Sequence, residues 1–179
     1  MIKELLTSLR AIIVLTVITS VAYPLLITGI GQLAFPSQAN GSLVKSGDQV
    51  VGSELLAQKF TDTKYFWPRP SAADYATVAS GASNQSFTSK KNLDAINALR
   101  TTLGADAPSD LLTASGSGLD PDISLEAARY QISRIATARG ISVEALTKLV
   151  NTMVQPPQLG FLGQPRVNVL LLNLQLDRL

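Results

Sequence analysis

The uncharged stretch AIIVLTVITSVAYPLLITGIGQLAF occupies residues 11–35 and decides the architecture of this chain. It lies within a longer gap without Asp, Glu, Lys or Arg, which extends from Arg10 to Lys45. As a helix rising about 1.5 Å per residue, this stretch would span roughly 37 Å, more than the hydrocarbon core of about 30 Å. The sequence therefore predicts a transmembrane helix over residues 11–35, preceded by a short segment at residues 1–10.

The flanking charges predict the orientation of this helix. Lys3 and Arg10 precede it, and positively charged flanks are retained in the cytoplasm. We therefore expect a single-pass plasma-membrane protein with a cytoplasmic N-terminus and residues 36–179 in an extracytoplasmic domain. A cleaved signal peptide is the alternative, because Ser37-Gln38-Ala39 has a small-x-small pattern, but the apolar region of a signal peptide is only about 7–15 residues long.

One face of the predicted helix carries hydroxyl groups. The positions i, i+3, i+4 and i+7 on this face are Thr16, Thr19, Ser20 and Tyr23. Small hydroxyl residues allow another helix to approach closely and to share hydrogen bonds. Pro24 has no N–H and its ring crowds the carbonyl of Ser20, so a kink is expected there. These five residues predict a helix-packing surface, in preference to a lone anchor.

Composition limits the chemistry open to this 19.0 kDa chain. The net charge is only +2 with scattered Lys and Arg, which argues against nucleic-acid binding. The chain has no Cys and no His, so it has no thiol nucleophile, disulfide, Cys/His zinc site or Ser-His-Asp triad. An enzyme of this composition would depend on carboxylates, Lys, Ser or Tyr.

Residues 36–179 predict a compact α+β or α/β domain. Apolar periodicity and capping residues indicate helices over residues 54–60 and 90–103, between Ser124 and Gly140, and between Ser142 and Pro156. Alternating leucines predict a strand over residues 167–176, and residues 105–119 read as a linker. Residues 65–70 are expected to be extended, with their aromatic side chains packed on the core.

The candidate chemical motifs are weak. Residues 120–124, DPDIS, begin like a calcium loop, but Leu125 and Gln131 replace the required Gly and Glu, so a helix start is the better interpretation. Residues 115–118, SGSG, resemble a flexible turn more than a phosphate loop. Residues 42–45, SLVK, fit the S-x-x-K pattern of Ser–Lys hydrolases, but the companion S-D-N and K-T-G boxes are missing.

Four segments, taken in order, resemble the potassium-transporting ATPase C chain, the family of C chains of the Kdp complex. The first is TGIGQ at 28–32, continuing through FP at 35–36 to QANGSL at 38–43. The second is FWPRPSA at 66–72 with SGASN at 80–84. The third is SGSGLDP at 115–121, followed by Gln131 and Arg134. The fourth is GQPRVNVL at 163–170 with LNL at 172–174. The likeness covers nearly the whole chain.

The resemblance implies residues for contact with a partner or ligand, and no catalytic or metal-binding residue. The contact candidates are Gln38, Asn40, Gly41, Arg69, Ser83, Asn84, Ser115, Gly116, Gly118, Asp120, Arg166 and Asn168. The chain departs from the family pattern at Ala82, Asp122 and Gln164, where Gly, His and Glu are common, and at Met153-Val154, where His-Thr is common. Roles that depend on those missing groups do not transfer to this chain.

The resemblance further implies an accessory subunit of an ATP-driven, high-affinity potassium importer. Its partners would be a channel-like A chain, a P-type ATPase B chain and a small F chain, besides membrane lipid. ATP and Mg²⁺ would bind the ATPase chain and potassium the channel-like chain, with no cofactor on this subunit. The sequence agrees, because it contains no D-K-T-G-T phosphorylation site and no T-V-G-Y-G-like filter.

The family is also proposed to act as a catalytic chaperone that raises the affinity of the ATPase chain for ATP. ATP is cytoplasmic, whereas the folded domain is expected outside, so we expect any such effect to be transmitted through the helix. Two alternatives remain from the sequence. An exported Ser–Lys hydrolase predicts a reactive Ser42, and a stand-alone anchored binding protein predicts stable monomers in detergent.

Overall fold

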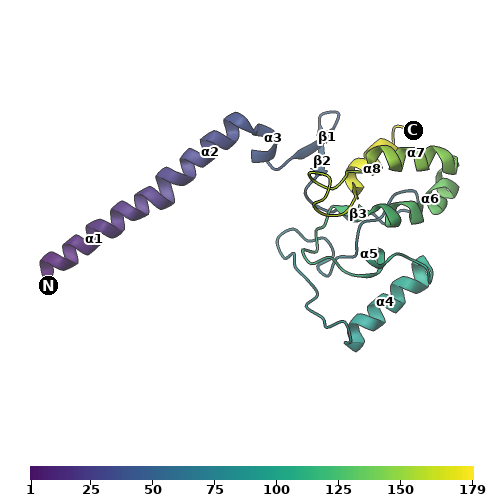
Figure 1. Cartoon of the computed structure of the whole chain (residues 1–179), viewed down its shortest axis with the longest axis horizontal. Coiled ribbons are helices and arrows are strands. Elements are labelled where there is room, and N and C mark those ends of the chain that lie inside the picture. The colour runs from purple at the N-terminus through teal and green to yellow at the C-terminus, as the bar shows by residue number, and fades with distance from the viewer. The chain divides into compact units, whose positions relative to one another are not determined.

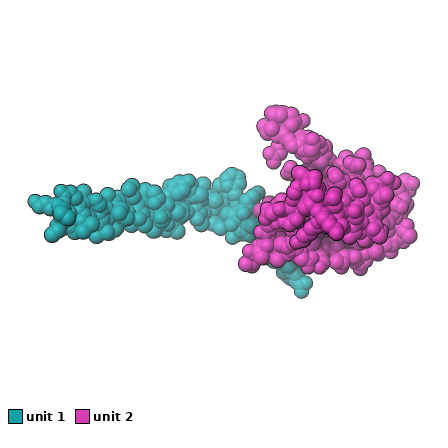
Figure 2. Space-filling view, turned by 90° about the horizontal axis from the view of Figure 1, so that it is seen from below, with its two compact units in different colours: residues 1–53 teal, residues 54–179 magenta.

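The computed structural model describes residues 1–179, which form two compact units, residues 1–53 and residues 54–179 (Figure 2). The first unit contains α1 (Ile2–Thr16), the π-helical segment η1 (Val17–Ala22), α2 (Tyr23–Ala34), α3 (Pro36–Ala39), β1 (Leu43–Ser46) and β2 (Gln49–Ser53). The second contains α4 (Lys90–Leu103), α5 (Ser109–Leu112), β3 (Asp122–Ser124), α6 (Leu125–Arg139), α7 (Val143–Met153), β4 (Arg166–Asn168) and α8 (Val169–Leu176).

A single long helix dominates the first unit. The segments α1, η1 and α2 follow one another without a break from Ile2 to Ala34, and Figure 1 shows them as one rod. The helix starts before the uncharged stretch because residues 2–10 are mostly good helix formers such as Leu, Lys and Glu. None of its side chains is buried, and it is long and apolar enough to cross a membrane.

The helix accommodates Pro24 by changing its hydrogen-bond pattern. In η1, directly before the proline, the Tyr23 N–H donates to the carbonyl of Ile18, five residues back, instead of four. A π-helical turn of this kind is a common response to a residue that cannot join the α-helical ladder. The kink predicted at Pro24 is absent, because the π-helical segment takes up the proline and Figure 1 shows a continuous rod there.

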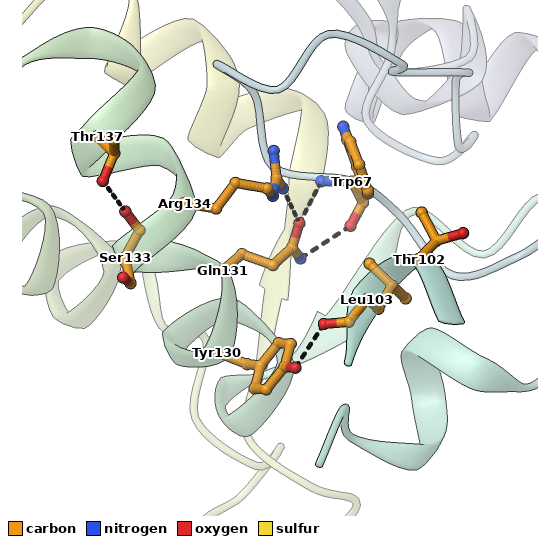
Figure 3. A pocket seen from close by; sticks show the side chains of 8 residues that line it. All are labelled: Trp67, Thr102, Leu103, Tyr130, Gln131, Ser133, Arg134 and Thr137. Atoms are coloured by element: carbon orange, nitrogen blue, oxygen red, sulfur yellow. Dashed lines mark hydrogen bonds between the residues drawn. The ribbon is translucent and has the colours of Figure 1, made fainter. Parts of the chain in front are cut away.

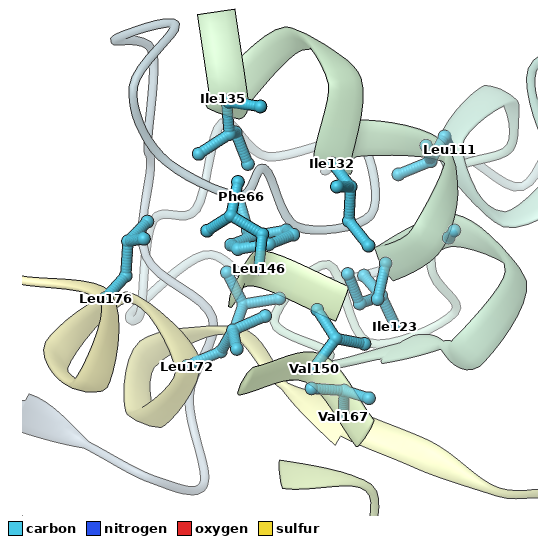
Figure 4. Packing of buried hydrophobic residues seen from close by; sticks show 14 residues of the cluster. Phe66, Leu111, Ile123, Ile132, Ile135, Leu146, Val150, Val167, Leu172 and Leu176 are labelled. Carbon is cyan, nitrogen blue, oxygen red and sulfur yellow. The ribbon is translucent and has the colours of Figure 1, made fainter. Parts of the chain in front are cut away.

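The second unit is built around one apolar core. Its buried members are Phe66, Leu111, Ile123, Ala127, Ala128, Ile132, Ile135, Ala136, Leu146, Val150, Val167, Val169, Leu172 and Leu176. Figure 4 shows Phe66 and Leu146 within this cluster, surrounded by side chains from α6, α7, α8 and the short sheet. In that sheet β3 and β4 run antiparallel, with Ile123 opposite Val167.

The topology is α+β. The other sheet pairs β1 with β2, also antiparallel, so neither sheet has the parallel strands of an α/β domain. The hairpin formed by β1 and β2 was not predicted from the sequence. Its turn includes Gly47 at a φ of 62°, a conformation that glycine adopts without steric cost.

The predicted central helices are confirmed. Residues 90–103 form α4, as their spacing predicted. The hydroxyl of Ser124 accepts a hydrogen bond from the Ala127 N–H at the start of α6. At the start of α7, the hydroxyl of Ser142 accepts one from the Ala145 N–H. Gly140 ends α6 in the left-handed conformation, at a φ of 66°.

Three element predictions were wrong. Residues 54–60 form turns and coil, because Ser53 ends β2 and does not cap a helix. The linker at 105–119 contains α5, which buries two leucines. The leucine-rich tail is a strand only at Arg166–Asn168 and then becomes α8, because the Asn168 side chain accepts a hydrogen bond from the Leu171 N–H and caps a helix.

Candidate functional site

Two buried side-chain amides hold the aromatic segment of the second unit. The Asn173 side chain accepts a hydrogen bond from the Phe66 N–H at 2.8 Å and donates to the Phe66 carbonyl at 2.9 Å. The Gln131 side chain accepts from the Trp67 N–H at 2.8 Å and donates to the Trp67 carbonyl at 3.1 Å. We call Gln131 and Asn173 the amide clamp, because together they satisfy the backbone N–H and carbonyl groups of two consecutive residues.

Arg134 extends this network to the surface. Its guanidinium lies 3.9 Å from the centre of the Trp67 ring, a cation–π contact. It also donates to the carbonyl of Tyr65 at 3.0 Å and to Oε1 of Gln131 at 2.7 Å. Burial lowers the pKa of Arg134 to about 10, which leaves the side chain charged at neutral pH. Figure 3 shows Trp67, Gln131 and Arg134 side by side.

A surface hollow of about 550 Å³ opens beside this network (Figure 3). It is lined by Trp67, Thr102, Leu103, Tyr130, Gln131, Ser133, Arg134 and Thr137. No lining side chain is a carboxylate or a lysine, and the Tyr130 hydroxyl already donates to the Leu103 carbonyl at 2.6 Å.

The second and third family-like segments meet in the structure. The Nη1 atom of Arg69 lies 3.0 Å from Oδ2 of Asp120. The Ser115 N–H donates to the carbonyl of Pro70 at 3.0 Å, and the other Asp120 oxygen accepts from the Asp122 N–H. These candidate residues brace two loops against each other, and they leave the Asp120 carboxylate engaged with Arg69.

The SGSG turn at residues 115–118 is packed, not free. Gly118 has a φ of 71°, and a Cβ atom at this position would lie only 2.9 Å from the carbonyl oxygen of Gly81. Glycine is thus required both by the backbone conformation and by the close approach of the 80–84 segment. Gly116, Ser83 and Asn84 remain exposed on the surface of the same region.

The fourth segment pairs with the carboxylate of Asp122. Nε of Arg166 lies 2.9 Å from Oδ2 of Asp122, although its N–H does not point at that oxygen. Burial raises the pKa of Asp122, while Arg166 opposes the rise and the charge of Asp120 adds to it. The Asn168 side chain donates to the Glu54 carbonyl at 2.7 Å. Asp120 and Asp122, the two acids of the DPDIS segment, are thus each paired with an arginine. The chain contains no cluster of three or more His, Cys, Asp or Glu that could hold a metal ion.

The first family-like segment shapes the chain reversal after the long helix. The Asn40 side chain donates to Oε1 of Gln32 at 3.0 Å and to the Pro36 carbonyl at 2.6 Å. The Gly41 N–H donates to the carbonyl of Gln38 at 3.0 Å. Gln38, Asn40 and Gly41 therefore lie together, within the first unit.

The S-x-x-K sequence does not form a nucleophile pair. Ser42 is 5% exposed and directly precedes β1, whereas Lys45 lies within that strand. A serine and a lysine three residues apart share a face on a helix, but successive side chains of a strand alternate between its faces. No hydrogen bond joins the two side chains, which removes the local support for a Ser–Lys hydrolase.

The predicted helix-packing residues surround η1. Thr16, Thr19, Ser20, Tyr23 and Pro24 all lie within or next to this segment, and all are exposed in the single chain. The Thr19 hydroxyl donates back to the Leu15 carbonyl at 2.8 Å, so it satisfies a backbone group of its own helix.

An exposed apolar turn stands out in the second unit. The Gln158 N–H donates to the Leu162 carbonyl at 2.9 Å and closes a small loop. Its tip presents Leu159, 83% exposed, and Phe161, 74% exposed. Leu159 adopts a φ of 54°, which non-glycine residues seldom do. Large apolar side chains gathered at one exposed site often mark a protein–protein contact.

The amide clamp was not predicted. Gln131 and Asn173 occur in the family-like segments, but their partners, Trp67 and Phe66, lie 64 and 107 residues away in sequence. The available signal was a polar residue on the otherwise apolar face of α6, and a second one inside the leucine-rich tail. Such a residue must find a hydrogen-bond partner when it is buried.

Comparison with known proteins supports the resemblance seen in the sequence. A profile described as "K+-transporting ATPase, c chain" matches residues 5–178. A potassium-transporting ATPase KdpC subunit from Polynucleobacter asymbioticus is 49% identical over 92% of this chain and 93% of its own length. The KdpC subunit of Rhodospirillum rubrum is 49% identical over 99% of this chain and 96% of its own length, and that of Serratia proteamaculans is 50% identical over 96% of each.

These matches extend across the long helix, the chain reversal and the clamped domain. In the structure, the polar groups of this site hold its loops and helices together. The chain therefore belongs to the family of C chains of potassium-transporting ATPases, as an accessory, non-catalytic subunit of such a complex.

Proposed function

We propose that this subunit assembles and stabilises an ATP-driven, high-affinity potassium importer through its membrane helix. The observation that carries the proposal is the group of exposed hydroxyl side chains within and beside η1, on a helix long enough to span a bilayer. In lipid, where hydrophobic burial gives helices no reason to associate, close packing and hydrogen bonds between small polar residues supply the attraction.

The proposed partners are a channel-like A chain, a P-type ATPase B chain and a small F chain. Potassium would bind the first, and ATP with Mg²⁺ the second. Lys3 and Arg10, at the N-terminal end of the helix, favour a cytoplasmic N-terminus, with residues 11–35 in the membrane and residues 36–179 outside. The exposed turn at Leu159 and Phe161 is the apolar surface that such a domain would offer to a partner chain.

A catalytic-chaperone role, if it is exerted, would act through the helix. A domain outside the membrane cannot touch cytoplasmic ATP, so it can change ATP affinity only by binding two states of the pump unequally. The helix is the part of this chain that reaches the cytoplasmic side in the proposed orientation.

The Ser–Lys hydrolase is not favoured by any observation, because Ser42 and Lys45 do not pair. In a stand-alone binding protein, the exposed hydroxyl residues around η1 would have no partner helix to contact. The assembly proposal gives them one.

The test is purification of the complex from mild detergent with a tag on this chain. Recovery of the partner chains and potassium-stimulated ATP hydrolysis are measured for the natural chain and for a variant whose residues 1–35 are replaced by an unrelated membrane helix. We expect both to be lost in the variant. A replacement helix that supports full recovery and an unchanged apparent ATP affinity would refute assembly and coupling through the helix.

A further inference from the structure

The main-chain hydrogen bonds around Pro24 leave the Thr19 carbonyl of the long helix without a donor. In an α-helix the Thr19 carbonyl would accept from the Tyr23 N–H, but in this chain that N–H donates to Ile18. In the π-helical pattern the donor would be the N–H of residue 24, which is a proline and has none. The Thr19 carbonyl therefore has neither its α-helical nor its π-helical partner.

No side chain of the protein replaces this donor. The nearest hydroxyl, that of Thr19 itself, donates one turn back to the Leu15 carbonyl at 2.8 Å. The surrounding stretch has no charged residue between Arg10 and Lys45, and it lies within the span that is apolar enough to cross a membrane. Lipid tails offer no donors, so an unpaired carbonyl is strongly unfavourable at this depth.

We propose that the Thr19 carbonyl accepts a hydrogen bond from a side-chain N–H on a membrane helix of a partner subunit. This inference rests on the proposed function, since it assigns one defined bond to the helix contact. Helix carbonyls point towards the C-terminal end of the helix, so the donor approaches beside Tyr23 and Pro24. The small side chains of Thr16 and Ser20 nearby leave a partner helix room to approach.

A partner subunit is a better donor than a second copy of this chain. Residues 11–31 contain no Asn, Gln, Lys, Arg or Trp, so a second copy would bring only hydroxyl groups to the contact. The chain belongs to a family of subunits of a larger transport complex. The proposed partner chains of that complex would supply the other membrane helices.

Pro24→Ala tests the inference because it returns an N–H to the helix. Whether the segment stays π-helical or becomes α-helical, the Thr19 carbonyl then finds a donor inside its own chain. We expect the affinity of this subunit for the complex to fall by about 3- to 20-fold, the effect of one interhelical hydrogen bond.

Two controls separate the donor from other effects. Leu26→Ala removes a side chain of the same helix without changing any backbone donor. N-methylalanine at position 24, introduced by semisynthesis, removes the proline ring but still lacks an N–H. We expect both to assemble like the natural chain. Equal losses for Pro24→Ala and N-methylalanine would show that the ring matters and not the donor, and would overturn the inference.

A spectroscopic measurement reports on the carbonyl directly. With ¹³C=¹⁸O at Thr19, the amide I band is expected to move to lower wavenumber when the labelled full chain enters the complex. An identical band in the free chain and in the complex would overturn the inference, as would a low band in the free chain, which would indicate water or a second copy as donor. If replacement of residues 1–35 abolishes assembly while Pro24→Ala does not weaken it, this inference fails and the proposed function stands.

Discussion

Single residues in this protein join segments that lie far apart in the sequence, and no local sequence pattern predicts these contacts. Gln131 and Asn173 are each 2% exposed, and each forms a pair of hydrogen bonds with the backbone of the aromatic segment. A leucine in either place would fill space but leave two backbone groups without partners. The cost of an unmade buried hydrogen bond exceeds the net value of a made one.

Replacement of Gln131 by Leu is expected to lower the free energy of unfolding by about 2–4 kcal/mol, because Trp67 and Arg134 both lose partners in a buried setting. Urea unfolding followed by the fluorescence of Trp67, the only tryptophan of the chain, measures this free energy with a probe next to the substituted residue. Gln175→Leu is the control, since it makes the same change on α8 at a side chain without a hydrogen bond, and it should alter stability by no more than about 0.5 kcal/mol. Equal losses for the two variants would contradict this account.

Tyr75 should make stability depend on alkaline pH. Its hydroxyl donates to the Arg69 carbonyl at 2.8 Å, and burial, aided by Asp74, raises the pKa of Tyr75 to about 12. An unfolded tyrosine ionises near pH 10, so between about pH 10 and 12 the folded chain holds a proton that the unfolded chain has lost. The free energy of unfolding therefore falls as the pH rises through this window.

Tyr75→Phe should flatten that part of the profile. The measurement is the slope of unfolding free energy against pH for the natural chain and the variant in parallel. Parallel slopes above pH 10 would show that Tyr75 ionises alike in the folded and unfolded states.

At the scale of elements, the helices of the second unit differ in how many residues they bury. α6 buries Ala127, Ala128, Gln131, Ile132, Ile135 and Ala136, whereas α4 buries no residue at all. Its apolar stripe is only partly covered, and Leu93 is 47% exposed. Local stability follows the number of buried contacts, so α4 is the helix of the second unit most ready to open or to be covered by a partner.

Hydrogen exchange should separate these two helices. Amides of α4 are expected to exchange on the order of tenfold or more faster than those of α6, measured by mass spectrometry on the full chain in detergent. In the assembled complex, slower exchange in α4 would mark it as a contact surface. Protection in the free chain equal to that of α6 would refute the ranking.

The predictable elements were those whose signals are local. α4, α6 and α7 combine an apolar stripe with a Ser cap or a terminal Gly, and each signal lies within a few residues of the others. The strand predicted over residues 167–176 was wrong for α8, because a run of leucines that is buried on several sides is compatible with a strand and with a helix. The cap at Asn168 decided between them. Among the site residues, the Arg69–Asp120 contact could not be read from sequence, since it joins positions 51 apart.

At the scale of the whole molecule, folding and membrane attachment are separable. The buried core cluster of the second unit runs from Phe66 to Leu176 and draws no member from the first unit. Residues 54–179 also fall within the usual domain size of about 50–250 residues. The membrane helix therefore determines where the second unit resides, while the fold of that unit follows from its own sequence.

Residues 54–179 expressed alone should fold. We expect the far-ultraviolet circular dichroism of the helices and a single cooperative urea transition, with a midpoint close to that of the full chain. Loss of cooperativity, with binding of a dye specific for exposed apolar surface, would show that the first unit is needed for folding.

The amide clamp also makes the centre of the domain indifferent to acidity. Asn and Gln neither gain nor lose a proton, and Arg134, with its pKa near 10, keeps its charge down to low pH. A carboxylic acid in place of either amide would have matched both backbone groups only while protonated; once ionised, it would have repelled the carbonyl it faces. With amides at both positions, the backbone of Phe66 and Trp67 is held equally well in acidic and in neutral surroundings.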